Sequence, residues 1–469
     1  MNPTSSNGEE RCRPVILTFT EFYLPGYKGG GPIRSTTSMV AALKDEFDFC
    51  IVTSDRDLGD RSAYPGIRVD AWQDVAGARV LYLSPGPLRW WRIARLLLAG
   101  DYDLIYLNSF FARAFSMLPI WLKRLGAARR IPVLLAPRGE FSLGALAIKA
   151  TRKRCYIALK RHLRLYAGVV WHASTEHEKV DILRTIASKR RILVAEPPLG
   201  MQVVVAKDPA FKAAPAKAGA SGRPKIPGSL DVVFVSRIGR KKNLDGALKI
   251  LAGVRGEVHF KIYGPIEDAA YWAECERLIN ELPANVKVDY CGDLPHARVA
   301  GIFRAHHLFL FPTAGESFGH VIAEALQTGC PALISDQTPW RHLRDKGAGW
   351  DVPLNRLDLF QQAIQECIGM DKVAFQKISQ QASQFGLEKA GGFGAVDENR
   401  NMFQLLLKGH LALGPQRASQ AQTEVLWSGQ PSENPKLDKV KSNHKRHFAS
   451  QPQVDIQAEP KHDDEHLAN

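Results

Sequence analysis

The chain has 469 residues, which is long enough for two or three domains, each with a sizeable hydrophobic core. Its 45% hydrophobic and 23% charged residues are typical of a soluble globular protein, and no apolar run approaches the roughly 18 residues that a membrane-spanning helix needs. The net charge of +14 is concentrated in residues 1–207, which hold 31 Lys and Arg against 18 Asp and Glu. A nucleic-acid-binding protein would be more uniformly basic, so we expect no nucleic acid partner.

Cysteine usage and the start of the chain favour a cytoplasmic protein. The seven cysteines are an odd number and include no Cys-x-x-Cys pair, so neither a disulfide framework nor a zinc site is indicated. Residues 1–14 are polar and lack the apolar segment of a signal peptide.

The first half of the chain alternates short apolar runs with helical patterns. Gly29-Gly-Gly-Pro32 turns the chain from the first run into a helix expected over residues 34–43. Strands that alternate with helices favour a parallel, doubly wound sheet. The strands expected in this half are 15–19, 49–53, 79–83, 104–107 and 132–136.

A change of composition divides the chain. Residues 207–228 are rich in Ala, Lys, Pro and Gly, show no periodicity and are typical of a linker. The alternation of strands and helices then starts again, which indicates a second α/β domain of the same kind. The strands expected there are 232–235, 258–262, 286–288, 308–311 and 332–334. The expected domains are 14–206 and 229–386, followed by a region 387–411 and a disordered tail, 412–469, rich in Ser, Gln, Lys, Glu, Pro and His.

Two glutamates eight positions apart, Glu316 and Glu324, mark the most informative segment. It follows the expected strand 308–311 and precedes an apolar helical run over 321–326, so Glu316 falls in a loop and Glu324 about two turns into a helix. The amides at the helix start would attract an anion, and a carboxylate can accept two hydrogen bonds from a vicinal diol. The segment can therefore hold two sugar rings with a diphosphate between them. A surface helix with two solvated glutamates would show the same bare spacing.

With the preceding strand, Pro312, Gly315 and the Gly329-Cys-Pro331 that follows, the segment resembles the Glu-x7-Glu signature of retaining glycosyltransferases of the GT-B fold, family 4 (glycosyltransferase group 1) type. The resemblance covers roughly residues 14–411. It implies two Rossmann-like domains facing across a cleft, with the first on the acceptor side and the second binding the donor. In such proteins a late helix crosses back to the first domain, and 399–411 is the candidate here.

The resemblance also implies roles for the residues of this segment. Glu316 would hold the transferred hexose, and Glu324 would hold the ribose of the nucleotide. The residues between them that would bind the donor are Ser317, Phe318, Gly319 and His320.

Arg237 and Lys242 follow the first strand of the second half. Ligands of open α/β sheets bind at the carboxyl ends of strands, where Arg237 falls, and Lys242 would begin the next helix with Asn243 as its cap. The family carries an Arg and a Lys five apart here, which bind the donor diphosphate and stabilise the leaving group. Fixed cations offset the negative charge that develops on a departing diphosphate. Lys241 is an alternative to Lys242, and a solvated basic turn would also fit the pattern.

The first half supplies candidates for the other wall of the cleft. Gly30 and Gly31 would let the backbone approach a ligand closely, and Pro32 suits the first helical turn. Similar loops in the family close over the donor phosphates or the acceptor. Arg138 and Glu140 follow the strand 132–136 and are candidates for acceptor binding. Many relatives have a histidine near the position of Arg138, so a histidine contact with the transferred sugar is in doubt here.

Two Asp-x-Asp pairs could hold a divalent metal in the manner of the other large glycosyltransferase fold, GT-A. Asp55 and Asp57 follow a strand and are the better pair, whereas Asp101 and Asp103 precede theirs. The glutamates and cations described above supply the sugar and phosphate contacts without a metal, so we expect no metal site and no cofactor.

Two stretches of the first half combine basic and apolar residues in a helical pattern. Residues 88–98 pair two tryptophans with three arginines, and residues 149–166 are basic and amphipathic. Such helices suit an anionic membrane surface, although an ordinary helix with one core face and one solvated basic face would also fit.

The sequence therefore predicts a cytoplasmic GT-B enzyme that transfers a hexose from a nucleoside diphosphate sugar to an acceptor hydroxyl with retention. Polysaccharide or glycolipid assembly, a lipid-linked or saccharide acceptor and a peripheral membrane location are expected. A GT-B nucleotide-sugar epimerase is the nearest alternative. A basic protein that binds membrane or nucleic acid and carries a degenerate donor site is another, which the complete set of Glu and Arg/Lys residues disfavours.

Overall fold

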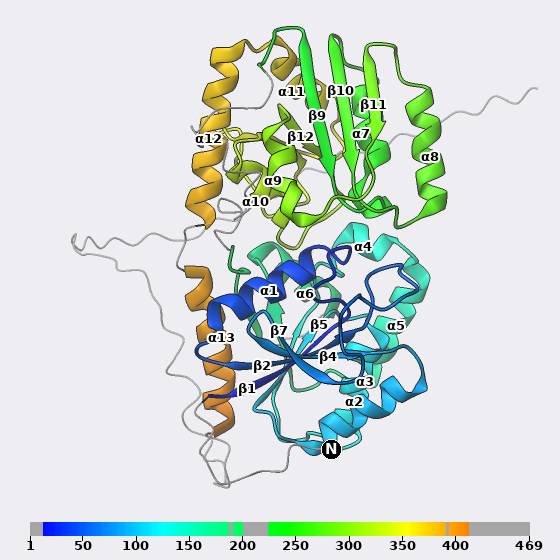
Figure 1. Ribbon diagram of the computed structural model, residues 1–469, viewed down its shortest axis with the longest axis vertical. Helices are drawn as coiled ribbons and strands as arrows, with labels where there is room; N and C mark the ends of the chain where they lie inside the picture. Colours follow the sequence, from blue (N-terminus) through cyan, green and yellow to red (C-terminus); the bar gives the residue numbers. More distant parts are fainter. Residues whose placement is uncertain (1–12, 187–190, 200–223, 391–393, 412–469) are drawn as a thin grey trace, which may run out of the picture. The chain divides into compact units, whose positions relative to one another are not determined.

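Both halves of the chain form parallel sheets in the computed structural model, which describes residues 13–186, 191–199, 224–390 and 394–411 (Figure 1). Most of the expected linker and all of the expected tail lie outside the described residues. We call residues 13–199 the first lobe and residues 224–390 the second lobe. All helices and strands named below belong to these described ranges.

The sheet of the first lobe has the strand order β3-β4-β2-β1-β5-β6-β7-β8 and is parallel except for the edge pair β3–β4. Its central strands are buried on both faces because helices cover them, which explains their continuous apolar runs. The strands are β1 (Val15–Thr20), β2 (Asp48–Ser54), β3 (Trp72–Val75), β4 (Ala78–Leu83), β5 (Leu104–Asn108), β6 (Val133–Ala136), β7 (Val169–Ala173) and β8 (Ile192–Val194). The helices are α1 (Gly31–Leu43), α2 (Pro87–Ala99), η1 (Arg113–Met117), α3 (Leu118–Arg124), α4 (Leu143–Ala147), α5 (Ala150–His162) and α6 (Glu176–Ile186).

The sheet of the second lobe is wholly parallel, with the order β11-β10-β9-β12-β13-β14. Chain order reverses between β9 and β12, and ligands of such sheets bind outside the carboxyl ends of the strands at this point. The strands are β9 (Ser229–Val235), β10 (Glu257–Tyr263), β11 (Val286–Tyr290), β12 (Leu308–Phe311), β13 (Ala332–Ser335) and β14 (Gly349–Val352). The helices are η4 (Arg240–Lys242), α7 (Leu244–Leu251), α8 (Ala269–Asn280), α9 (His296–Arg304), α10 (His320–Gln327), α11 (Leu357–Gly369) and α12 (Lys372–Ala390).

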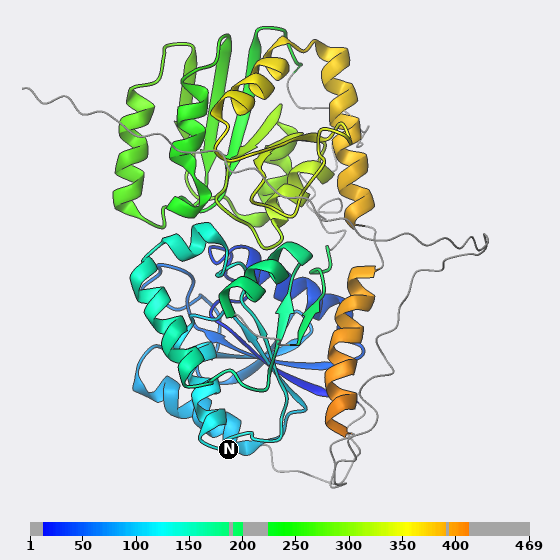
Figure 2. The same cartoon turned by 180° about the vertical axis from the view of Figure 1, so that it is seen from behind.

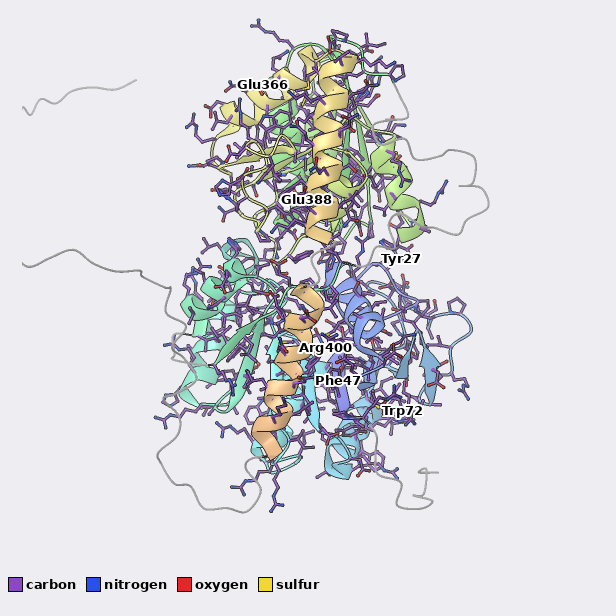
Figure 3. All side chains as sticks on the ribbon, turned by 90° about the vertical axis from the view of Figure 1, so that its left-hand side faces the viewer. Tyr27, Phe47, Trp72, Glu366, Glu388 and Arg400 are labelled. Carbon is purple, nitrogen blue, oxygen red and sulfur yellow. The ribbon has the colours of Figure 1, made fainter. Side chains whose placement is uncertain are left out.

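The last described helix, α13 (Gly394–Leu411), packs on the first lobe although it follows the second in the chain. Figure 2 shows α12 in yellow beside the second lobe and α13 in orange beside the first. The ring of Phe403 lies 5.5 Å from that of Phe47 and is fully buried. Arg400 Nε donates to Glu46 Oε2 at 2.7 Å, and Figure 3 shows Arg400 and Phe47 close together. The expectation of a late helix that crosses back is therefore confirmed.

The two predicted GT-B sheets are confirmed, with corrections at their edges. The prediction omits β3, β7, β8 and β14. Strands β3, β8 and β14 have only three or four residues, and β3 and β8 are partly exposed, whereas β7 is a buried strand inside its sheet. Asn243 does precede α7, but its side chain caps nothing in that helix. It has a left-handed φ of 57°, and its Nδ2 donates to the carbonyl of Pro312 at 2.8 Å. Lys242 ends the short η4 turn rather than beginning a helix. Asn243 therefore ties the loop after β9 to the loop after β12.

Candidate functional site

Glu316 and Lys242 form a largely buried ion pair where the loops after β12 and β9 meet. Lys242 Nζ donates to Glu316 Oε1, and Thr313 Oγ1 donates to the same oxygen at 3.2 Å. Burial alone raises the pKa of Glu316, but Lys242 and Lys241 outweigh it, so the pKa lies below its usual value. Glu316 is therefore an anion at neutral pH, and its second oxygen, Oε2, accepts no hydrogen bond from the described residues.

Glu324 lies inside α10 and contacts two cationic or polar side chains that the sequence did not indicate. Its Oε1 accepts from Arg34 of α1 and lies 3.1 Å from His296 Nε2 of α9. Its Oε2 is buried and has no hydrogen-bond partner among the described residues. A buried carboxylate oxygen without a donor is costly, so this atom is suited to a ligand hydroxyl.

Arg237 lies at the carboxyl end of β9, as predicted, and faces the glycine loop that precedes α1. Its Nη1 is 3.3 Å from Glu267 Oε1. Gly30 has a left-handed φ of 71°, and a Cβ built on it would lie 3.8 Å from Arg237 Nε. Pro32 stands in the first turn of α1, and Gly31 is its first residue. The glycine loop and the first cation of the predicted pair thus share one cavity wall.

Asp57 holds this glycine loop in place. Its Oδ2 accepts the backbone amides of Tyr27 and Lys28 at 2.7 and 3.0 Å. Asp55 forms a two-point ion pair with the neighbouring Arg56. Both carboxylates of the Asp-x-Asp pair are therefore engaged, that of Asp57 by the glycine loop and that of Asp55 by Arg56. The sheet that carries them belongs to the GT-B fold, whereas the metal hypothesis was taken from GT-A.

The start of α10 closes the cavity from the second lobe. Gly319 precedes the helix with a φ of 86°, and His320 Nε2 lies 2.8 Å from Ser35 Oγ of α1. Burial, together with the nearby Arg34, lowers the pKa of His320 to about 3, so its imidazole is neutral at physiological pH. The first amides of α10 lack helical acceptors and can bind an anion without competition from a charged histidine.

Loop 316–320 also binds the first lobe. Thr175 Oγ1 donates to the carbonyl of Ser317 at 2.9 Å. Phe318 is buried, with its carbonyl accepting from Trp340 Nε1 at 2.6 Å. The loop is thus fixed on both sides.

Arg138 and Glu140 follow β6, as expected, but both side chains are engaged within the first lobe. Arg138 has a strained left-handed φ of 54°, and its guanidinium donates to Asn108, Ser174 and Tyr106 at 2.6–3.1 Å. It still lines the cavity. Glu140 accepts hydrogen bonds from Ser109 Oγ and from the backbone amides of Phe110 and Phe111, so it orders the loop after β5. A direct contact of either residue with the acceptor stays a prediction.

Two cavities meet at the side chains just described. The smaller, which we call the cleft cavity, has a volume of about 180 Å³ and is lined by both lobes. The larger cavity has about 850 Å³ and extends over the carboxyl ends of β1, β5 and β6. Both are lined by Pro32, Arg138, Arg237, Lys241 and Lys242. A molecule in one cavity therefore lies beside a molecule in the other.

The matches to known families follow this division into two lobes. Residues 222–384 match the family model of glycosyl transferases group 1, and residues 30–197 match the glycosyl transferase 4-like domain. The chain carries the two domains of a GT-B glycosyltransferase. No curated protein matches this glycosyltransferase significantly in sequence.

Solved structures show the same fold over most of the glycosyltransferase. Sucrose-phosphate synthase from Thermosynechococcus elongatus aligns with a TM-score of 0.62 and 18% identity, over 85% of this chain and 100% of that one. HepE from Anabaena, in complex with UDP-glucose, aligns with a TM-score of 0.58 and 16% identity, over 84% and 99%. An alpha,alpha-trehalose-phosphate synthase (UDP-forming) from Burkholderia vietnamiensis aligns with a TM-score of 0.57 and 13% identity, over 84% of this chain and 97% of that one. At these identities the likeness shows the shared fold.

Lys241, the alternative to Lys242, reaches the opposite lobe. Its Nζ donates to the carbonyl of Gly139 at 3.1 Å. Burial lowers the pKa of Lys241 to about 8, and Glu316 opposes this effect. An anion bound in the cleft cavity favours the charged ammonium. Above about pH 8, binding such an anion must therefore take up a proton.

We accordingly expect the affinity of the wild type for a nucleoside diphosphate to fall by up to about tenfold per pH unit above pH 8. Lys241→Arg should remove most of this dependence, because arginine stays charged. Calorimetric titration of UDP or GDP between about pH 7 and about pH 10 measures the affinity of the wild type and of Lys241→Arg. Identical pH profiles for the two proteins would contradict a role for Lys241.

Gly144 packs closely against a loop of the second lobe. A Cβ built on Gly144 of α4 would lie 2.5 Å from the carbonyl oxygen of Ala314, in the loop that carries Glu316. Gly144→Val should hold the lobes apart and lower transfer by about tenfold or more, because misplaced reacting groups lose proximity. Gly369→Val, at a site with open space around it, is the matched control. Equal rates of transfer in Gly144→Val and Gly369→Val would show that close packing of Gly144 against Ala314 is not needed for activity.

Proposed function

We propose that this glycosyltransferase moves a hexose from a nucleoside diphosphate sugar to an acceptor hydroxyl and retains the anomeric configuration. The observation that carries the proposal is the convergence of Glu316, Lys242 and Arg237 on one cavity, with the unpartnered Oε2 of Glu324 nearby. The similar HepE from Anabaena was solved in complex with UDP and glucose and with UDP-glucose, which supports a nucleotide-sugar donor.

The proposed mechanism assigns separate tasks to these side chains. The ribose donates to Glu324, the hexose to Glu316, and the diphosphate lies against Arg237, Lys242 and the start of α10. Breaking the bond between the anomeric carbon and phosphate leaves negative charge on phosphate oxygens, which the two cations offset. The departing phosphate accepts the proton of the acceptor hydroxyl, which attacks from the same face. This route needs neither a protein base nor a metal. With its pKa lowered to about 3, His320 would be a poor base for the acceptor proton.

A donor screen tests the proposal. Any ligand that binds only the folded state raises its stability, by about 2.7 kcal/mol at a concentration of 100 Kd. At least one UDP- or GDP-sugar should raise the melting temperature of the wild type and should do so less in Glu324→Ala. If no nucleotide sugar raises the melting temperature of the wild type, the proposed function is wrong. Conversion of the free nucleotide sugar into its epimer would instead favour the epimerase alternative.

We further propose a lipid-linked or saccharide acceptor presented at an anionic membrane surface. The two predicted basic stretches form α2 and α5, and both expose apolar side chains, with Trp91 61% and Leu159 52% exposed. Lys160 is an exception to the predicted basic face, because it is buried and stacks on Trp121. No described helix has the length and apolar character to cross a membrane.

Vesicle binding tests the membrane proposal. The protein should bind anionic vesicles at low salt and be released at high salt, since each basic residue at the surface contributes about 1 kcal/mol. Arg154→Gln with Arg161→Gln, both exposed on α5, should weaken binding about thirtyfold and leave donor affinity unchanged. If the wild type does not bind anionic vesicles at low salt, a soluble acceptor is favoured instead.

A further inference from the structure

An apolar groove lies between α2, α3 and α5 of the first lobe, and none of the proposed donor-binding residues lines it. Figure 1 shows where these three helices lie in that lobe. Its volume is about 600 Å³, within the range of roughly 300–1,000 Å³ of small-molecule sites. The walls are mainly aromatic or apolar, although Trp90 and Trp121 remain 44% and 41% exposed. The lining residues are Trp90, Phe111, Arg113, Met117, Leu118, Trp121, Lys149, Arg152, Lys153 and Tyr156.

The charges of the apolar groove have one sign. Four of its lining residues, Arg113, Lys149, Arg152 and Lys153, are basic, and none is acidic. The first three are exposed and have no ion pair with any residue that the structure describes. Lys153 Nζ donates to the carbonyl of Ala145 at 2.6 Å and lies 5.3 Å from the centre of the Phe111 ring. Apolar walls beside exposed cations that have no described ion pair complement a molecule that has an apolar chain and an anionic group.

The apolar groove continues into the larger cavity of the active site. Phe111, Lys149 and Lys153 line both, and the larger cavity in turn shares Arg237 and Lys242 with the cleft cavity. A molecule in the groove can therefore extend, past Lys153, toward the site at which the donor sugar would be transferred.

We propose that the apolar groove holds the hydrocarbon chain of a lipid phosphate to which the acceptor sugar is attached. The phosphate would lie against Arg113, Lys149 and Arg152, with the sugar in the larger cavity and its reactive hydroxyl toward the cleft cavity. This inference rests on the proposed function and names the chemical class of its acceptor. It differs from attraction to a membrane surface, because a concave site binds a single lipid molecule.

Binding of alkyl phosphates tests the groove directly. Hexyl, octyl and decyl phosphate, kept below their micelle concentrations, would be titrated into the full chain and followed by calorimetry. Affinity should rise about fourfold with each methylene until the groove is filled, since burying a methylene contributes about 0.8 kcal/mol. Inorganic phosphate should bind far more weakly than decyl phosphate, and so should decyl maltoside, which has the same chain without the charge.

Two matched pairs of variants separate the groove from the surface around it. Trp90→Ala and Arg152→Gln change the lining and should each weaken decyl phosphate binding about tenfold or more. Trp91→Ala and Arg154→Gln change exposed neighbours on the same helices that do not line the groove, and should bind decyl phosphate as the wild type does. All four side chains are partly or largely exposed, so folding should survive, which circular dichroism checks.

The same experiments distinguish failure of the groove proposal from failure of the proposed function. The groove proposal is overturned if decyl phosphate binds no tighter than inorganic phosphate or decyl maltoside. It is also overturned if a lining variant and its matched control lose the same affinity for decyl phosphate. The donor screen is run on the same samples. A wild type that binds decyl phosphate but no nucleotide sugar would contradict the proposed function, whereas donor binding without chain-length dependence would contradict the groove alone.

Discussion

Replacing Glu316 by glutamine should lower the rate of transfer about a hundredfold, while the affinity for the nucleoside diphosphate changes little. The carboxylate is held by Lys242 and Thr313, and its free oxygen is proposed to accept hydrogen bonds from the hexose. Losing charge-assisted hydrogen bonds costs about 2–3 kcal/mol, which corresponds to that factor. The comparison variant Glu324→Ala should mainly weaken nucleotide binding. Wild-type rates in a folded Glu316→Gln protein would remove Glu316 from the mechanism.

A loss of activity must be separated from a loss of stability. The ion pair is largely buried, with side chains 14% and 13% exposed, so removing one partner leaves a buried charge and can cost about 3–5 kcal/mol. The double variant Glu316→Gln with Lys242→Met removes both charges and should recover most of the lost stability. It should remain inactive, because it lacks both proposed contacts with the donor. Recovery of activity together with stability would show that the pair is only structural.

Replacing Arg237 by alanine should lower kcat about 10²- to 10³-fold, because a fixed positive group beside the leaving diphosphate is lost. Arg237 lines both cavities, and its only ion pair among the described residues is a 3.3 Å contact with the partly exposed Glu267, so folding should persist. A chelator should have little effect on the wild type. Arg344→Ala, which removes an exposed arginine paired with Glu366 in the same lobe, is the control.

Two results would contradict this role. Equal rates in Arg237→Ala and Arg344→Ala would show that Arg237 does not stabilise the leaving group. Complete loss of wild-type activity in chelator, restored by a divalent metal, would return attention to Asp55 and Asp57, despite their contacts with Arg56 and the glycine loop.

Local patterns were sufficient to predict much of the fold. Continuous apolar runs marked β1, β5 and β12 because strands of a covered parallel sheet are buried on both faces. Strand β3 was missed for the opposite reason. In β3, which pairs antiparallel with β4, the side chains are half-exposed and mixed in character, so the pattern resembles a loop.

The candidate site could be predicted only as separate segments. The motifs indicated Glu316 and Lys242, but they lie 74 positions apart, and no local pattern shows that their side chains bond to each other. Arg34 contacts Glu324 across 290 positions and was missed because an arginine early in a helix has no special signature. The support of the glycine loop by Asp57 was missed because the Asp-x-Asp spacing drew attention to a metal instead.

The anomeric form of the first sugar released from the donor tests the central proposal most directly. Water can replace the acceptor slowly, so the wild type should hydrolyse an α-linked nucleotide sugar that it binds. Proton NMR at early times should show the α anomer of the free hexose before mutarotation, and Glu316→Gln should release about a hundredfold less. Initial release of the β anomer, or release that is unchanged in Glu316→Gln, would contradict retaining transfer at this site.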